Sequence, residues 1–455
     1  MNSLIATDKY YIVVGTGVTG QSVARYLQSI GKRFSFFDTR ANPSGLDDCR
    51  AHFADVPIYL QSIDHSILCG AEEIILSPGV SREQPDIAAA IAAGVPVVGD
   101  ISVFLRENMA RKNPAKVVGV TGSNGKTTVT TLLGMAAQRD GLTVAVGGNI
   151  GTPALDLLEK NAALVVLELS SFQLESISKA SLDVACVLNV SEDHMDRYDS
   201  FVQYAMTKQR IYFAAKQVVY NIDEPLTIPP VVEKTRRVGF GYSSNKEESE
   251  KKYTLDPQTG AIYCGAEKLI DRMQIKLQGS HNLLNASALF ALCDAAGIRQ
   301  QALIDVLGRF AGLPHRCEWV AKKQGVTYVN DSKATNVGAA VAALKGFADH
   351  QGRIVLIAGG DSKDASFDVF GQTVDSYVKH LVLLGRDAKK IASAVTDQAR
   401  ISFVSSLEEG VALAADKATA DDIVLLSPAC ASLDMFSGYE QRGEVFRSAV
   451  MRLAS

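Results

Sequence analysis

Cysteine is scarce in this sequence and follows no pattern. The 455 residues include seven cysteines, an odd number, and no two of them form a Cys-x-x-Cys pair. Such scattered residues give no ligand set for structural zinc and no framework of disulfides. Chains of this kind are typical of a reducing compartment, so we expect a cytoplasmic protein.

Long apolar runs and an excess of charge of one sign are also missing. No apolar run approaches the length of a membrane span, and the first nine residues lack the apolar core of a signal peptide. The formal net charge of −4 gives no reason to expect a polyanionic partner. We therefore expect neither nucleic-acid binding nor membrane insertion. We also expect the chain to act as a monomer.

The length of the chain predicts two or three domains. Hydrophobic residues make up 47% and charged residues 21%, as in ordinary globular enzymes. Strand–helix alternation recurs along the chain and breaks at two polar or Gly/Pro-containing stretches. We predict an α/β protein of three domains, at 1–110, 111–312 and 313–455. The first and third are expected to be Rossmann-like, and the central one a phosphate-loop mononucleotide-binding domain with a parallel sheet.

The most informative stretch is residues 117–128, Val-Val-Gly-Val-Thr-Gly-Ser-Asn-Gly-Lys-Thr-Thr. It predicts a buried strand over 117–120, a tight loop with two glycines and a helix over 129–139. Backbone N–H groups of such a loop surround an anion, and the helix dipole assists them. The lysine then reaches the β- and γ-phosphates, and the first threonine hydroxyl reaches Mg²⁺. We expect ATP here, bound by Gly122, Ser123, Asn124, Gly125, Lys126, Thr127 and Thr128.

One feature departs from the standard loop, and one alternative stands beside the prediction. Gly122 stands three residues before Gly125, where the usual loop has five. The alternative is a glycine-rich turn followed by a surface lysine. The flanking strand and helix favour the ATP loop.

A second glycine-rich turn opens the chain. Residues 10–15 predict a strand, Gly15-Thr16-Gly17-Val18-Thr19-Gly20 follows, and a helix is expected over 21–30. This matches the dinucleotide fingerprint, with Asp38 after the next strand at 34–37. An NAD enzyme is therefore one hypothesis, although any nucleotide-diphosphate ligand could use the same turn.

An almost wholly apolar run at 163–169 predicts a central parallel strand covered on both faces. Glu168 lies near its carboxyl end, where a Mg²⁺ ligand belongs in a phosphate-loop protein. The alternative is a carboxylate that caps the next helix. A strand is also expected at 184–189 and a helix at 201–215, which contains Lys208. By themselves, His194 would be a packed polar residue and Lys208 a solvated one.

The rest of the chain predicts a polar excursion and a third domain. Residues 241–260 are expected to form an exposed hairpin or loop, and a helix starts around His281–Asn285. Beyond the Gly/Pro boundary at 312–316, strands are expected at 327–329, 353–357, 380–384, 401–404 and 423–426. Polar sets follow three of these strands, at 331–336, 359–363 and 427–434. Such sets line ligand crevices in open α/β sheets.

These motifs together resemble the Mur ligases, the ATP-dependent amino-acid ligases of peptidoglycan precursor synthesis, over essentially the whole chain. Residues 121–128 look like the ATP loop of that family, which shares the short glycine spacing. The resemblance implies two Mg²⁺ ions, with Thr127, Glu168, His194 and Lys208 at the metals. It implies that Lys208 carries CO₂ as a carbamate, and that Lys126, His194 and Lys208 are catalytic. Arg316 of the hinge then reaches ATP, and Asn285 and Asp331 contact adenosine.

The resemblance extends to a subtype. Residues 330–336 read Asn-Asp-Ser-Lys-Ala-Thr-Asn, as in the D-glutamate-adding members, whereas sister ligases have an Asp-Tyr-type stretch. The implied partners are UDP-N-acetylmuramoyl-L-alanine and D-glutamate. For D-glutamate the resemblance implies Thr335, Lys363, Ser432, Leu433 and Tyr439, the last at a position where Phe is common. For the nucleotide-linked substrate it implies Gly17, Thr19, Asp38, Thr39, Arg40, Ser77, Gly79 and Asn149.

The chemistry of such a ligation agrees with these residues. Joining a carboxylate to an amine needs an activated acyl group, which ATP supplies by phosphorylating the carboxylate. Several negative groups then meet, so electrostatic stabilisation by Mg²⁺ and Lys126 is the main need. An oxidoreductase would leave the ATP loop idle, and a folylpolyglutamate synthase would resemble only the second and third domains. A sister amide ligase remains an alternative.

Overall fold

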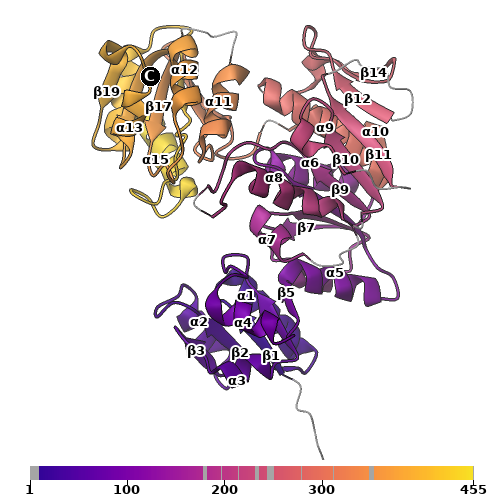
Figure 1. The fold of residues 1–455 in the computed structure, drawn as a ribbon. Coiled ribbons are helices and arrows are strands. Elements are labelled where there is room, and N and C mark those ends of the chain that lie inside the picture. The colour runs from indigo at the N-terminus through magenta and orange to yellow at the C-terminus, as the bar shows by residue number, and fades with distance from the viewer. Residues whose placement is uncertain are drawn as a thin grey trace, which may run out of the picture.

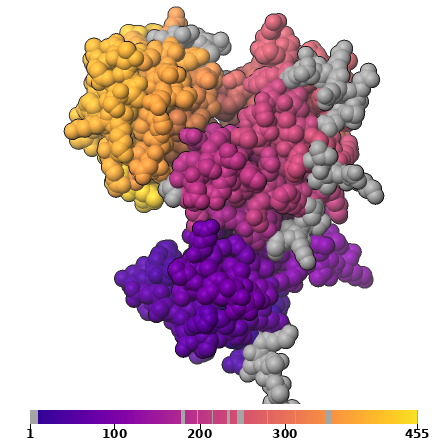
Figure 2. Space-filling model, viewed as in Figure 1, coloured from indigo at the N-terminus to yellow at the C-terminus, as the bar shows by residue number. Residues whose placement is uncertain are grey.

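The protein is described by a computed structural model that covers residues 10–177, 182–195, 197–213, 215–230, 235–242, 251–277, 279–310, 312–347 and 353–453. Three sheets follow one another along the chain, and Figure 1 shows each with its own helices. The α/β fold in three domains is thus as predicted. In the view of Figure 2 the first domain and the third each lie against the central one and do not touch each other.

The first sheet has the order β3-β2-β1-β4-β5 and is parallel throughout. The order reverses beside β1, and ligands of open α/β sheets bind at such a point. Its strands are β1 (Tyr10–Val14), β2 (Arg33–Asp38), β3 (Ile58–Leu60), β4 (Glu73–Leu76) and β5 (Val97–Gly99). Its helices are α1 (Val18–Ser29), α2 (Leu46–His52), α3 (His65–Cys69), α4 (Pro85–Ala92) and α5 (Asp100–Ala110).

The central sheet has the order β14-β13-β12-β11-β10-β9-β6-β8-β7, parallel except at β12-β13-β14. Its strands are β6 (Lys116–Thr121), β7 (Val144–Gly148), β8 (Leu164–Glu168), β9 (Val184–Val187), β10 (Gln217–Asn221), β11 (Arg236–Gly241), β12 (Lys251–Leu255), β13 (Ile262–Cys264) and β14 (Glu267–Ile270). Its α-helices are α6 (Lys126–Arg139), α7 (Ser171–Glu175), α8 (Phe201–Gln209), α9 (Ser280–Ala296) and α10 (Gln300–Leu307). Short 3₁₀ helices lie at Leu155–Lys160, Arg210–Tyr212, Pro225–Thr227 and Arg272–Gln274.

The third sheet has the order β15-β16-β20-β17-β18-β19, and only β15 is antiparallel to its neighbour. Its strands are β15 (Glu318–Lys323), β16 (Val326–Asn330), β17 (Ile354–Gly359), β18 (Val378–Leu384), β19 (Ile401–Phe403) and β20 (Ile423–Leu426). Its helices are α11 (Val337–Gly346), α12 (Asp368–Tyr377), α13 (Ala388–Ser393), α14 (Leu407–Lys417) and α15 (Tyr439–Arg452), with a 3₁₀ turn at Gln398–Arg400.

Two local expectations are wrong in part. The exposed hairpin or loop expected over 241–260 is in part a hairpin, because β12 pairs antiparallel with β13, but it is not exposed: Tyr253 and Leu255 are buried. Residues 243–250 lie outside the described residues. The sequence did not predict β12 because charged residues surround it and only one of its faces packs on the core. The helix expected over 201–215 ends at Gln209 and tightens into a 3₁₀ turn.

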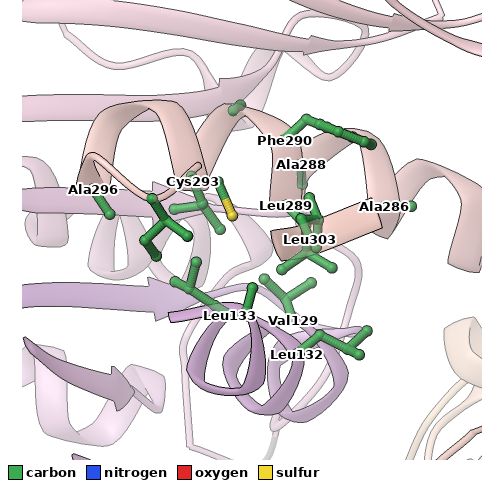
Figure 3. Packing of buried hydrophobic residues seen from close by; sticks show 14 of the residues in the cluster. Val129, Leu132, Leu133, Ala286, Ala288, Leu289, Phe290, Cys293, Ala296 and Leu303 are labelled. Carbon is green, nitrogen blue, oxygen red and sulfur yellow. The ribbon is translucent and has the colours of Figure 1, made fainter. Parts of the chain in front are cut away.

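The core of the central domain lies between its sheet and the helices α6, α9 and α10. Figure 3 shows Val129 and Leu133 of α6 facing Leu289 and Cys293 of α9 and Leu303 of α10. This packing fixes the direction of α6, and α6 begins at Lys126, directly after the glycine-rich loop. The loop is therefore held between a buried strand and a buried helix.

Replacing Leu133 with alanine should destabilise the central domain. Leu133 is fully buried, and the cavity left by such a truncation typically costs about 2–5 kcal/mol. A urea titration that follows unfolding measures the loss. Met135→Ala in the same helix is the matched control, because Met135 is 37% exposed and should cost below about 1 kcal/mol. Equal losses in the two variants would contradict this account of the core.

Candidate active site

The glycine-rich loop adopts a backbone that requires its two glycines. The φ angles of Gly122 and Gly125 are 153° and 81°, in the region that residues with a Cβ rarely adopt. A Cβ on Gly125 would lie 2.6 Å from Oδ1 of Asn285 on α9. Helix α9 therefore approaches the loop closely at Gly125, and Asn285, expected to contact adenosine, lies beside it.

Two lysine amines converge on one carbonyl of this loop. The Lys126 Nζ donates to the Gly122 carbonyl at 2.7 Å and to the Ser123 carbonyl at 2.8 Å. The Lys208 Nζ donates to the same Gly122 carbonyl at 3.0 Å. Burial lowers the pKa of both amines, and the charge of Lys126 lowers that of Lys208 further. Lys208 is 1% exposed, so the solvated lysine considered from the sequence is wrong.

Glu168 lies at the carboxyl end of β8, next to the start of α6. Its carboxylate accepts hydrogen bonds from the Thr127 hydroxyl at 2.7 Å and from the Asn149 amide at 2.9 Å. The following helix is capped by Ser170 and Gln173, which excludes the capping role for Glu168. A hydroxyl and a carboxylate beside a phosphate loop suit Mg²⁺, which prefers oxygen ligands and takes the rest from phosphate and water.

The guanidinium of Arg316 contacts the same Thr127 hydroxyl that donates to Glu168. Its Nη2 lies 2.5 Å from the Thr127 hydroxyl oxygen. Burial lowers the pKa of Arg316, while the Glu168 carboxylate acts in the opposite direction. The hinge arginine predicted to reach ATP therefore already contacts the phosphate loop.

Asp193 is a further acidic residue beside the candidate site, and no sequence motif indicated it. Its carboxylate accepts from the backbone N–H of His194 at 3.0 Å and from the Asn336 amide of the third domain at 3.2 Å. It is one of the anions whose field raises the pKa values of Lys126 and Lys208. The sequence sign that could have identified Asp193 is its position directly before His194, the candidate metal ligand. His194 packs against the Phe172 ring at 4.8 Å.

In the parts of the chain that the structure describes, no group of three His, Cys, Asp or Glu side chains could hold a metal. The candidate metal donors are instead of mixed type. They combine the Thr127 hydroxyl, the Glu168 carboxylate, His194 and Lys208, and an unmodified lysine ammonium cannot ligate a cation.

A cleft of about 490 Å³ separates the loop and α9 from the start of the third domain; we call it the hinge cleft. Six of the predicted nucleotide residues line it, namely Asn124, Gly125, Thr128, Asn285, Arg316 and Asp331. Lys333 also lines the hinge cleft, although the sequence did not predict it as a site residue. Its Nζ lies 3.6 Å from the centroid of the Tyr439 ring, and burial followed by the charge of Arg316 lowers its pKa to about 8.

A second cleft, of about 670 Å³, lies between the first and central domains; we call it the N-terminal cleft. It is lined by Gly17, Thr19, Thr39, Arg40, Ser77, Gly79 and Asn149 of the predicted set, and also by Gln173. Asp38 does not line it. Burial raises the pKa of Asp38, but hydrogen bonds from Arg40 and Thr16 outweigh burial and the net pKa is lowered. Asp38 therefore orients Arg40 and the glycine turn.

The five residues predicted for the amino acid line neither cleft. Thr335, Lys363 and Ser432 follow β16, β17 and β20, which are neighbours in the third sheet, and Tyr439 begins α15. Leu433 is 73% exposed. Because these strands are adjacent and parallel, their carboxyl ends form one edge of the third domain. Among the described residues, Asn336 and Arg316 connect this edge to the central site.

Comparison with protein families finds three consecutive matches. Residues 9–99 match the Mur ligase MurD-like N-terminal domain, residues 120–293 the Mur ligase middle domain, and residues 315–430 the Mur ligase glutamate ligase domain. Together they span most of the chain in the order of the three sheets.

Curated relatives match along the full length. The chain is 50% identical over 453 residues to the UDP-N-acetylmuramoylalanine–D-glutamate ligase of Teredinibacter turnerae, covering 99% of both chains. It is 46% identical over 455 residues to the protein of that name from Pseudomonas aeruginosa, covering 99% of this chain and 100% of the relative.

Solved structures share the fold at low identity. The pseudomurein peptide ligase type C of Methanothermus fervidus aligns with a TM-score of 0.61 at 18% identity, covering 98% of this chain and 100% of the other. The UDP-N-acetylmuramate-alanine ligase MurC of Thermotoga maritima gives 0.60 at 19%, covering 97% and 99%. Within the described residues, every helix is too short or too polar to cross a membrane.

Lys126→Ala should lower the turnover number while the fold persists. We expect the amine to stabilise charge on a transferring phosphoryl group, and loss of such a group typically costs about 10²–10³-fold in kcat. Steady-state ATP turnover measures the effect, and circular dichroism checks the fold. Lys112→Ala, at an exposed lysine before β6, serves as the control. Near-normal kcat in the Lys126 variant would remove the loop from the reaction.

Proposed function

The chain belongs to the Mur ligase family, and from this premise we propose that it joins D-glutamate to UDP-N-acetylmuramoyl-L-alanine. The reaction consumes ATP, forms an acyl phosphate and releases ADP and phosphate. One pair of hydrogen bonds carries the proposal. Glu168 accepts one from Asn149 of the N-terminal cleft and one from Thr127 of the phosphate loop, so it links the two sites. Phosphate release with this substrate and a panel of amino acids tests it.

The charge of each site residue sets its proposed role. Lys126 and Arg316 hold positive charge at the loop, where the γ-phosphate meets the substrate carboxylate. Thr127 and Glu168 would hold a Mg²⁺ ion, which would neutralise negative charge on the phosphates. Asn149 orients Glu168 from the side of the N-terminal cleft. This arrangement brings two anions together without a protein nucleophile.

A second Mg²⁺ would be held by His194 and by Lys208 as a carbamate. Carbamate formation needs a neutral amine, and burial with the charge of Lys126 lowers the pKa of Lys208. At a given pH a lowered pKa increases the neutral fraction of the amine. Added CO₂ converts the side chain into an anion with two oxygen donors. Carbamate formation would also remove the positive charge of Lys208 from beside the Gly122 carbonyl, which Lys126 contacts as well.

The remaining proposals concern the state of the protein in the cell. We place it in the cytoplasm, where its nucleotide-linked substrate and ATP are available, in the synthesis of peptidoglycan precursors. The site needs residues from one chain only, because all three domains contribute to it, so we propose a monomer.

D-Glutamate should be accepted and L-glutamate rejected. Lys363 would bind one carboxylate as a point charge, with hydrogen bonds from Ser432 and Thr335. Lys363→Ala should raise the KM for D-glutamate by about tenfold or more, since hydrogen bonds to charged groups are worth about 1.5–3 kcal/mol. Lys389→Ala, an exposed lysine on α13, is the control. An unchanged KM would show that this pocket is misassigned, and preference for another amino acid would make the subtype wrong.

Carbon-13 bicarbonate should label the wild-type protein with a carbamate signal that Lys208→Ala lacks. The variant should also lose most activity, part of which a short carboxylate in the buffer restores. Lys216→Ala is the control, because Lys216 is 67% exposed and pairs with Asp183. Identical spectra for wild type and Lys208→Ala, or full activity of that variant, would exclude the carbamate.

Small-angle scattering should show compaction when an ATP analogue and the nucleotide-linked substrate bind together. The amino-acid residues lie on the third domain and line neither cleft, so the reacting groups meet only if that domain approaches. Residues 312–316 are the expected hinge of this closure. An unchanged radius of gyration in the ternary complex would count against it.

A further inference from the structure

Arg442 is a buried cation that the proposed reaction does not use. It lies on α15 and is 2% exposed. Its Nε donates to the Ser332 hydroxyl at 3.0 Å, and its Nη2 donates to the Ser332 carbonyl at 2.8 Å. Both terminal nitrogens contact the Cys430 carbonyl at 3.2 Å, and Nη1 contacts the Ala431 carbonyl at 3.4 Å.

These contacts join three segments that carry candidate amino-acid residues. Ser332 belongs to the loop after β16, which leads to Thr335. Cys430 and Ala431 belong to the loop after β20, which leads to Ser432. The Ser332 hydroxyl also donates to the Tyr439 carbonyl at 2.8 Å, so the start of α15 is held by the same hydroxyl.

The positive charge of Arg442 has no direct carboxylate partner among the described residues. Its hydrogen-bond acceptors are three carbonyls and one hydroxyl. The two carboxylates whose charge affects its pKa accept hydrogen bonds from other residues: Asp331 from Ser427 and Cys317, and Asp434 from the backbone of Arg386. Burial lowers the pKa of Arg442 to about 10, so it stays charged at neutral pH.

A charge buried without a counter-ion is costly unless an anion arrives to compensate it. A guanidinium has five donors in a planar fork, and here the fork spans two loops in a way that a lysine ammonium cannot. The arrangement therefore does two things at once. It fixes the relative position of the two loops, and it leaves positive potential behind the edge on which they lie.

We propose that Arg442 is the positioning residue of the amino-acid pocket, which holds the loops at 331–335 and 430–433 in register and favours a substrate with two carboxylates. This inference rests on the proposed function, since it assumes that these loops bind the amino acid. Arg442 itself does not touch the substrate. It acts through Ser332 and through the backbone that precedes Ser432.

The test compares Arg442→Lys and Arg442→Gln with Arg452→Gln, an exposed arginine on the same helix. Arg442→Gln should raise the KM for D-glutamate by about tenfold or more, as expected when hydrogen bonds to a charged group are lost. The KM values for ATP and for UDP-N-acetylmuramoyl-L-alanine should stay within about twofold. Arg442→Lys keeps the charge without the fork and should fall between wild type and Arg442→Gln. Arg452→Gln should behave as wild type.

Ser332→Ala keeps the protein testable if Arg442→Gln fails to fold. It removes one acceptor of Arg442 and the bond to Tyr439, and it should raise only the KM for D-glutamate, by a smaller factor. Guanidinium ion should restore part of the D-glutamate affinity to Arg442→Ala, but not to Lys363→Ala.

Two results would overturn the inference. One is an unchanged KM for D-glutamate in Arg442→Gln, or in Ser332→Ala if the former does not fold. The other is an equal rise in the KM values for all three substrates, which would indicate a purely structural role. Failure of the proposed function is a separate result, because the wild-type protein would then release no phosphate with D-glutamate.

Discussion

Positive charge concentrated out of water is the constraint on which the site depends. Lys126 and Lys208 share the Gly122 carbonyl, and Arg316 contacts Thr127 within the same region. Burial lowers the pKa of each of these cations. The protein partly balances them with Glu168 and Asp193. Anionic ligands are needed to complete this balance, and phosphate groups beside a helix N-terminus supply it most naturally.

Each of the three sheets contributes residues at strand carboxyl ends to one of the two clefts or to the loop beside them. β8 ends in Glu168 beside the phosphate loop, and β16 leads into Asp331 at the hinge cleft. The glycine turn after β1 lines the N-terminal cleft, and Asn149 of the central domain lines the same cleft. Two contacts, Arg316 with Thr127 and Asn336 with Asp193, join the third domain to the central site. Domain position and charge balance are therefore linked.

Much of the fold could be read from local pattern. The glycine-rich loop, the apolar β8 and the strand–helix repeats of the third domain each have a signature within about ten residues. β12 and β15 could not be found this way. β12 has charged residues around a one-sided apolar face, and β15 pairs antiparallel in a domain whose repeats predict parallel strands. The domain boundaries at 110 and 312 stay predictions.

The sequence by itself determined the glycine-rich loop between a strand and a helix, the carboxylate at the end of β8 and the family resemblance, because each depends on neighbours in the chain. Only the tertiary structure decided that Lys208 is buried, that Lys333 lies over Tyr439 and that Asp193 meets Asn336. It also decided that Arg442 joins two loops that are about a hundred residues apart in the sequence. Such roles arise from contacts between distant segments, and a lone lysine, aspartate or arginine has no local pattern that reports them.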